Sequence, residues 1–204
     1  MLFLHWLLIG AGAWFIAVAL KITGDVLFQR NVTVELRDWV TAVLSGLWAS
    51  ICDLGLAAIF FMVWSATVWD AVGYALGAAA VEFLLLLPAA FGGGIEPEKK
   101  RRKDSKAPAQ MMTWRNFAIE RVVAVVGHIA NRVLVWIGVA GGGGIAAVGA
   151  VFGLYTLAEG LAAYGEAKDW NWLTPRVMWP FLIVQALIVC VTIRLALRWS
   201  GILA

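Results

Sequence analysis

The sequence predicts an all-α protein, a membrane-embedded bundle of about six transmembrane helices. Two observations predict this class. Of the 204 residues, 62% are hydrophobic and only 14% are charged, whereas soluble domains carry about 25% charged residues. The apolar residues also fall into runs of roughly 20, the length of helix that crosses a hydrocarbon core about 30 Å thick. We therefore expect a single integral membrane domain over residues 1–204 that contacts the lipid bilayer.

Spans are predicted at residues 2–20, 39–65, 69–91, 116–140, 144–164 and 178–199. No basic segment precedes the first apolar run, and we interpret it as a retained span rather than a cleaved signal. The second and third spans form one apolar block too long for a single helix. We place the break between Ser65 and Asp70, where Asp70 would cap the third span. The run of four glycines at 141–144 is expected to form a tight turn.

Basic residues gather on one side of the predicted membrane. Of the 16 Lys and Arg residues, 12 lie in the connections at about 21–38, 92–115 and 166–176. Because Lys and Arg are concentrated in cytoplasmic loops, we expect these connections in the cytoplasm and both termini outside it. The predicted location is the cell membrane, inner or plasma.

The connection at 92–115 is predicted to be a flexible loop, and it contains the basic run 99–103. Such a run can bind nucleic acid or anionic lipid, or it can simply set the orientation of the spans. Lys and Arg next to a span are what orientation requires. We favour that second interpretation and expect no nucleic-acid partner.

The fourth span contains five strongly polar side chains: Glu120, Arg121, His128, Asn131 and Arg132. At about 100° per residue, all five fall within one third of the helix circumference. The opposite side carries only apolar residues. Polar groups are costly in hydrocarbon, so this face is expected to line a polar interior or cavity.

Two more carboxylates lie deep in predicted spans, Asp53 in the second and Glu82 in the third. Counted at about 1.5 Å per residue from the cytoplasmic ends, Asp53, Glu82 and His128 are all about 15 to 20 Å deep. We expect these three residues to form a site near the membrane midplane.

A shallower layer is predicted about 6–8 Å from the same side, where Glu120, Arg121 and Glu159 lie. In this layer Arg121 or Arg132 is expected to pair with Glu159 or Glu120.

Three interpretations of the midplane site stay open. In a catalytic site, Glu82 would act as the base on water, while His128 and Asn131 donate to a developing oxyanion. In a metal site, His128 and Glu82 would be ligands of zinc, although zinc normally takes more nitrogen or sulfur. In a structural site, Asp53, Glu82 and Arg132 would neutralise one another.

Four stretches carry a family resemblance: Gly12–Lys21, Gly46–Gly55, Gly73–Glu82 and Ile119–His128. The most specific piece is Glu120-Arg121, followed seven residues after the arginine by His128. These stretches resemble the YhfC family of multi-span membrane proteins, which are regarded as intramembrane metalloproteases similar in style to the CAAX-processing (CPBP) group. The resemblance covers about residues 10–139, and its motifs are short.

The chain departs from the family pattern at two positions. The family has a histidine four residues before the glutamate of span three, where this chain has Ala78. It has a glutamate in span two, where this chain has Asp53. Losing one of two histidines removes either a metal ligand or an oxyanion donor. The resemblance therefore implies a protease-like fold in a degenerate member, more than it implies protease activity.

Three hypotheses of function follow. The first is a YhfC-like intramembrane peptidase, with Glu82, His128 and Asn131 as catalytic residues and zinc as the implied cofactor. Its supporting polar network would be Asp53, Glu120, Arg121, Arg132 and Glu159. The second is a non-catalytic accessory subunit that contacts other transmembrane subunits of a larger complex. The third, a proton or ion pathway, is less favoured because spans five and six offer no matching deep charge.

Overall fold

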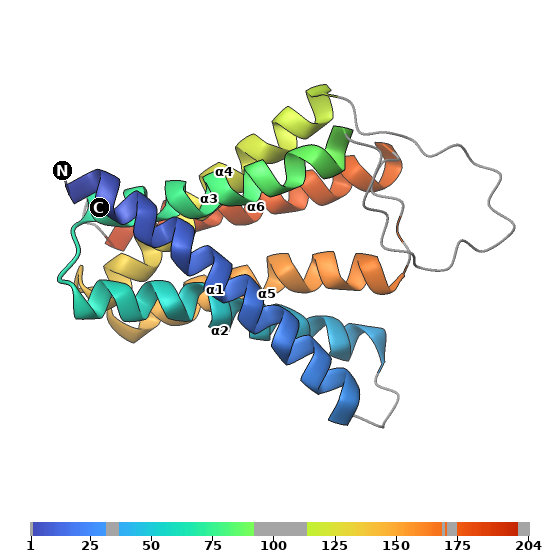
Figure 1. Ribbon diagram of the computed structural model, residues 1–204, viewed down its shortest axis with the longest axis horizontal. Helices are drawn as coiled ribbons and strands as arrows, with labels where there is room; N and C mark the ends of the chain where they lie inside the picture. The colour runs from blue at the N-terminus through green and yellow to red at the C-terminus, as the bar shows by residue number, and fades with distance from the viewer. Residues whose placement is uncertain (1, 32–36, 92–113, 169, 171–174, 200–204) are drawn as a thin grey trace, which may run out of the picture.

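The structure, a computed structural model, describes residues 2–31, 37–91, 114–168, 170 and 175–199. Within these ranges the chain is all-α (Figure 1), and its helices are α1 Leu2–Asn31, α2 Asp38–Val63, α3 Val68–Phe91, α4 Trp114–Val139, α5 Gly144–Ala167 and α6 Pro175–Trp199. Each of the six contains a stretch long and apolar enough to cross a membrane. The predicted class, an all-α multi-pass membrane protein, is confirmed. The basic run at 99–103 lies outside the described residues.

Helices α2 to α6 begin and end within three residues of the predicted span limits. Helix α1 differs, because it continues to Asn31 instead of ending at residue 20. Its segment 21–31 contains no proline and a single glycine, Gly24, so nothing in the sequence stops the helix there. As a result Lys21 lies on a helix, not in a loop.

The helices form two groups with α1 across them (Figure 1). Helices α3, α4 and α6 run side by side, and α2 packs against α5. Helix α1 crosses diagonally and contacts both α3 and α2, while α4 joins the groups through contacts with α2 and α5. The start of α1 lies at the same end of the bundle as the end of α6.

Glycines let the backbones of α1 and α3 touch. A Cβ atom built on Gly10 would lie 2.0 Å from the carbonyl oxygen of Tyr74, and one on Gly77 would lie 1.9 Å from that of Leu7. No side chain fits at either position without moving a backbone. Small residues of this kind allow helices in membranes to pack closely.

The α2–α5 interface also depends on a small residue. A Cβ atom on Gly46 would lie 2.4 Å from the carbonyl oxygen of Thr156. One turn along α2, the hydroxyls of Ser50 and Thr156 share a hydrogen bond of 2.8 Å. By contrast, a Cβ atom built on Gly149 or Gly153 of α5 would meet no atom of the described residues within 4 Å, so the described helices do not pack closely at these two positions.

Two short turns close one end of the bundle. The Asp70 carboxylate accepts hydrogen bonds of 2.8 Å from the backbone N–H and the hydroxyl of Thr67, which closes a capping box at the start of α3. Between α4 and α5, Gly142 and Gly144 have φ values of +85° and +61°, in the left-handed region that favours glycine.

The apolar core fills the same end of the bundle as these turns. Its large members come from the start of α1, the second half of α2, the start of α3 and the end of α4: Trp6, Leu54, Phe61, Tyr74, Leu134 and Ile137. The Trp136 indole Nε1 donates to the Ala66 carbonyl at 2.6 Å and ties α4 to the α2–α3 turn. The polar residues of the spans therefore lie in the other half of the bundle.

Candidate functional site

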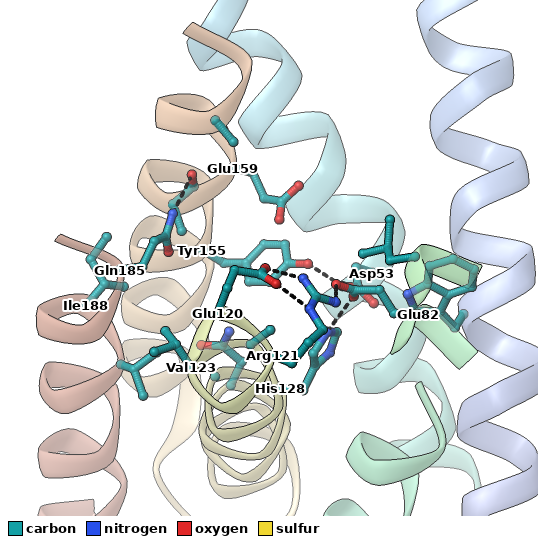
Figure 2. Close-up of a pocket in the computed structure, with 18 of the residues that line it drawn as sticks. Asp53, Glu82, Glu120, Arg121, Val123, His128, Tyr155, Glu159, Gln185 and Ile188 are labelled. Carbon is teal, nitrogen blue, oxygen red and sulfur yellow. Dashed lines mark hydrogen bonds and ion pairs between the residues drawn. The ribbon is translucent and has the colours of Figure 1, made fainter. Parts of the chain in front are cut away.

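A cavity of about 380 Å³ lies in that half, and all six helices contribute to its wall. Figure 2 shows charged side chains from several helices pointing toward one another around it. Its polar lining residues are Lys21, Asp53, Glu82, Glu120, Arg121, His128, Asn131, Arg132, Tyr155, Glu159 and Gln185. We refer to this space as the polar cavity. Every residue of the predicted midplane and shallow layers lines it.

Helix α4 contributes more polar side chains to the wall of the polar cavity than any other helix, as its sequence pattern predicted. Its cavity-facing positions repeat every three or four residues, with Ala124 and Gly127 between the polar ones. On the other face of the helix, Val122 is 63% exposed. One face of α4 therefore lines the polar cavity, and the other is apolar and outward-facing.

Glu82 of α3 joins two polar residues of α4 (Figure 2). Its Oε2 lies 2.8 Å from His128 Nε2, and its Oε1 accepts a hydrogen bond of 2.9 Å from Arg121 Nη1. Arg121 also donates to the carboxylate of its neighbour Glu120. The predicted meeting of Glu82 with His128 is thus present, and Arg121 adds a third member.

Asp53 of α2 forms a second cluster deeper in the bundle. Its Oδ1 accepts a hydrogen bond of 2.5 Å from Arg132 Nη2 of α4, and its Oδ2 accepts one from the Tyr155 hydroxyl of α5. All three side chains are buried, and the Arg132 side chain has no exposed area. The expected contact of Asp53 with Glu82 and His128 is not made. Its ion pair with Arg132 is the one that the structural interpretation of the site predicted, and its bond to Tyr155 was not predicted.

The rim of the polar cavity carries a third pair. Lys21 Nζ lies 3.5 Å from Glu159 Oε2, which joins α1 to α5. Glu159 was expected to pair with an arginine of α4, and the structure gives it Lys21 because α1 continues as a helix past residue 20. On the far side, the Gln185 side chain of α6 donates to the Ala158 carbonyl of α5 at 3.2 Å.

Three polar residues of the site escaped the sequence reasoning: Lys21, Tyr155 and Gln185. Lys21 stands at the end of an apolar run, where a loop is the usual interpretation. Tyr155 and Gln185 are neutral, so they give no charge signal in an apolar span. A search for all hydrogen-bonding groups at span depth would have found Tyr155, because its position on α5 is four residues before Glu159 and therefore on the same face.

Some buried polar atoms of the site have no hydrogen-bond partner among the residues that the structure describes. They are Nδ1 of His128 and both Nε and Nη1 of Arg132. A buried donor or acceptor without a partner costs about 1–3 kcal/mol, and more when the group is charged. These atoms belong to side chains that line the polar cavity, so a polar group that enters the cavity is a candidate partner for them.

The charges that line the polar cavity are almost balanced. Among the described residues of the lining, three carry a positive charge, Lys21, Arg121 and Arg132, and four are carboxylates. With His128 counted as neutral, the lining carries one excess negative charge. A cavity with this lining favours water, a neutral polar group or a cation over a free anion.

The arrangement is a poor match for the zinc that the family resemblance implies. Catalytic zinc takes three protein ligands in a tetrahedral site. In the described part of the chain, no group of three or more His, Cys, Asp and Glu side chains could hold a metal ion. The predicted ligands His128 and Glu82 bind each other, and Arg121 occupies the second carboxylate oxygen of Glu82. We therefore derive no chemistry through a metal at this site.

The arrangement can instead support proton transfer. A histidine whose one ring nitrogen is held by a carboxylate can take a proton on the other. Asn131 also lines the polar cavity and adds a neutral amide next to this histidine.

Comparison of the chain with protein-family models, with curated proteins and with solved structures finds no match.

Proposed function

We propose that this multi-pass membrane protein is an intramembrane hydrolase that acts on an amide or ester bond, similar in kind to the YhfC-like peptidase that the sequence resembles. The observation that carries the proposal is the hydrogen-bonded Glu82–His128 pair on the wall of a polar cavity. Hydrolysis needs an activated water molecule, and this pair is the group in the site suited to accept a proton.

The roles differ from those expected from the sequence. Both carboxylate oxygens of Glu82 are already engaged, one by Arg121 and the other by His128. Its proposed role is therefore positioning: it holds His128 Nε2 and leaves Nδ1 free to act. His128 takes the role of general base.

The proposed reaction begins when a water molecule attacks the carbonyl carbon of the substrate. A carbon–oxygen bond forms, the water proton moves to His128 Nδ1, and the carbonyl electrons move to the oxygen. The tetrahedral species then collapses and the bond to the leaving amine or alcohol breaks. The leaving group takes the proton from His128, so the products are a carboxylic acid and an amine or alcohol.

The proposal is tested in liposomes with single-span peptides that carry a fluorophore and a quencher at their two ends. Cleavage separates the pair and raises the fluorescence. We expect His128→Asn to lower the rate about 10²–10⁴-fold, the usual contribution of general acid–base catalysis. Glu82→Gln should also lower it, because the amide no longer holds the histidine as a carboxylate does.

Asp70→Asn is the matched control. It makes the same carboxylate-to-amide change at a buried residue outside the polar cavity, and the Asn side-chain oxygen can still accept the hydrogen bonds from Thr67. Its rate should equal that of the wild type. Cleavage that is unchanged in both the Glu82 and the His128 variants would rule out the proposed chemistry.

The accessory-subunit hypothesis stays a prediction from the sequence. It requires a stable partner in the membrane. Purification of the native protein in a mild detergent, followed by identification of what accompanies it, tests this prediction directly.

A further inference from the structure

Arg132 is the most deeply buried cation of the site. Its side chain has no exposed area, and Nη2 donates to Asp53 Oδ1 at 2.5 Å. Its Nε and Nη1 atoms have no hydrogen-bond partner in the described part of the chain. A guanidinium has five N–H donors and cannot give up its proton, so these donors stay in place at any physiological pH.

Asp53 and Tyr155 hold this guanidinium in position. The carboxylate binds Nη2 through one oxygen, and its other oxygen accepts the Tyr155 hydroxyl, so neither competes for Nε or Nη1. The Tyr155 ring also lies 5.9 Å from the Arg132 guanidinium carbon. Donors fixed in this way need no reorientation of the guanidinium itself when an acceptor reaches them.

The placement of Arg132 fits that of the proposed base. His128 and Arg132 are four residues apart on α4, so their side chains lie one turn apart on the same face. Both residues line the polar cavity. A group bound to Arg132 would therefore lie one helical turn from the proposed base His128.

The charge of the site selects the kind of acceptor. The lining already has four carboxylates against three cations, and Asp53 neutralises Arg132 itself. A free anion would add to the excess negative charge, whereas a neutral carbonyl oxygen accepts hydrogen bonds without doing so. The rest of the wall includes apolar side chains such as Phe181, Leu182 and Val189, which suit an apolar body attached to that carbonyl.

We infer that Arg132 is the substrate-binding cation of the site, and that its Nε and Nη1 donate to the uncharged carbonyl oxygen of an apolar amide or ester. This inference rests on the proposed function, because the carbonyl it binds is the one that water attacks. As the oxygen gains negative charge in the reaction, the fixed cation stabilises it. The sequence assigned this role to His128 and Asn131, and the unpartnered donors assign it to Arg132.

Binding of a ligand that cannot be cleaved tests the inference separately from hydrolysis. The probes are 2-decanone, which has a carbonyl, decane, which has none, and decanoate, which is an anion. Each is added to the detergent-solubilised protein at the same mole fraction in the micelle, and the melting temperature is measured. We expect 2-decanone to raise the melting temperature by a few degrees and the other two to leave it unchanged.

Arginine variants test whether the rise in melting temperature with 2-decanone depends on Arg132. Arg132→Met should abolish the rise, and Arg194→Met, at an exposed arginine of α6 outside the polar cavity, should retain it. Because Arg132→Met leaves Asp53 buried without its cation, the double variant Asp53→Asn/Arg132→Met removes both charges together and serves if the single variant does not fold. It too should show no rise with 2-decanone.

Three results would overturn the inference: equal stabilisation by decane, greater stabilisation by decanoate, or no stabilisation by any probe. Measurements of peptide cleavage distinguish the role inferred for Arg132 from the proposed hydrolase function. If the peptides are cleaved, removal of Arg132 should lower kcat about 10²–10³-fold, the cost of losing one oxyanion donor. If a variant without Arg132 cleaves the peptides at the wild-type rate, the role inferred for Arg132 is wrong and the proposed hydrolase function still holds. If 2-decanone binds in a way that depends on Arg132 but no peptide is cleaved, the proposed hydrolase function is wrong and the carbonyl-binding site still holds.

Discussion

Asp53 and Arg132 form a buried ion pair between α2 and α4, with Nη2 of the arginine 2.5 Å from Oδ1 of the aspartate. The two residues are 79 positions apart in the sequence. Removing one partner of a buried pair leaves an uncompensated charge, which typically costs about 3–5 kcal/mol. Removing both in favour of apolar groups of similar size is often neutral or stabilising.

Asp53→Leu should therefore destabilise the protein by about 3–5 kcal/mol, and the double variant Asp53→Leu/Arg132→Met should recover most of that loss. Unfolding of the detergent-solubilised protein, followed by circular dichroism against denaturant, measures both free energies. If the double variant is as unstable as the single one, the cost comes from packing and not from the unpaired charge.

The contact between α1 and α3 gives a prediction about packing. In Gly77→Ala the new methyl carbon would lie 1.9 Å from the carbonyl oxygen of Leu7, so α1 has to move away from α3. Overpacking of this kind costs about 1–3 kcal/mol. Gly12→Ala is the matched control, because it makes the same change on α1 where the new Cβ atom would meet no atom of the described residues within 4 Å. We expect a lower melting temperature for Gly77→Ala alone; an equal loss in the control would show a general intolerance of alanine.

Much of this fold could be predicted from residue chemistry alone. Apolar runs of span length predict the helices, and the spacing of the polar side chains of α4 predicts which of its faces lines the polar cavity. These features are local, since they depend on residues close together in the chain. The meeting of Glu82 with His128 also follows from depth, because both residues are counted from the same side of the membrane.

The partners within the site were harder to predict, because depth does not say which helices are neighbours. Asp53 and Glu82 have similar predicted depths, yet Asp53 binds Arg132 and Tyr155 because α2 packs against α5 and α4. That packing depends on the close approach at Gly46, and a small residue in the sequence allows such an approach without saying which helix makes it. Lys21 was missed for another reason: the end of the apolar run is not the end of α1.

The Ser50–Thr156 bond gives a prediction about hydrogen bonds between helices. Ser50 shares a 2.8 Å bond with Thr156 of α5, whereas the buried Thr192 hydroxyl donates to Ile188 on its own helix at 2.9 Å. Hydrogen bonds between helices in membranes average about 0.6 kcal/mol and reach about 1.7 kcal/mol. Ser50→Ala should lose stability in that range, while Thr192→Val, which keeps the shape, should lose less. A larger loss at Thr192 would contradict the assignment of the stability to the α2–α5 contact.

The surface pair Lys168–Asp38 gives a prediction about titration. Asp38 accepts a hydrogen bond from Lys168 at the end of α5, and this bond raises the pKa of Lys168 above its ordinary value. Because the folded pKa is raised, the stabilisation is complete below the ordinary lysine pKa of about 10.4 and is lost as the pH rises through the folded value. Titration of the labelled Lys168 amine by NMR should show the raised pKa in the wild type and a lower one in Asp38→Asn. Glu166→Gln, at an exposed carboxylate next to this lysine, is the control and should leave the titration unchanged.

The last prediction concerns the side from which the polar cavity opens. The apolar core fills the end of the bundle that carries the α2–α3 and α4–α5 turns, and Lys21 and Glu159 lie at the rim in the other half. The distribution of basic residues predicts that this other half faces the cytoplasm. In a variant whose Cys52 and Cys190 are replaced by Ala, Glu159→Cys should react with a membrane-impermeant thiol reagent in inside-out vesicles and not in right-side-out ones.

Ser65→Cys, in the exposed α2–α3 turn, is the matched control for orientation and should show the opposite pattern. Reversed labelling at both positions would mean that the protein is inserted the other way round, with the cavity still open. Labelling of Ser65→Cys alone would mean that water does not reach the rim, because a thiolate must be solvated to react with such a reagent. In that case substrate could enter only from the bilayer, between helices. The two positions therefore separate an error in orientation from an error in the route to the site.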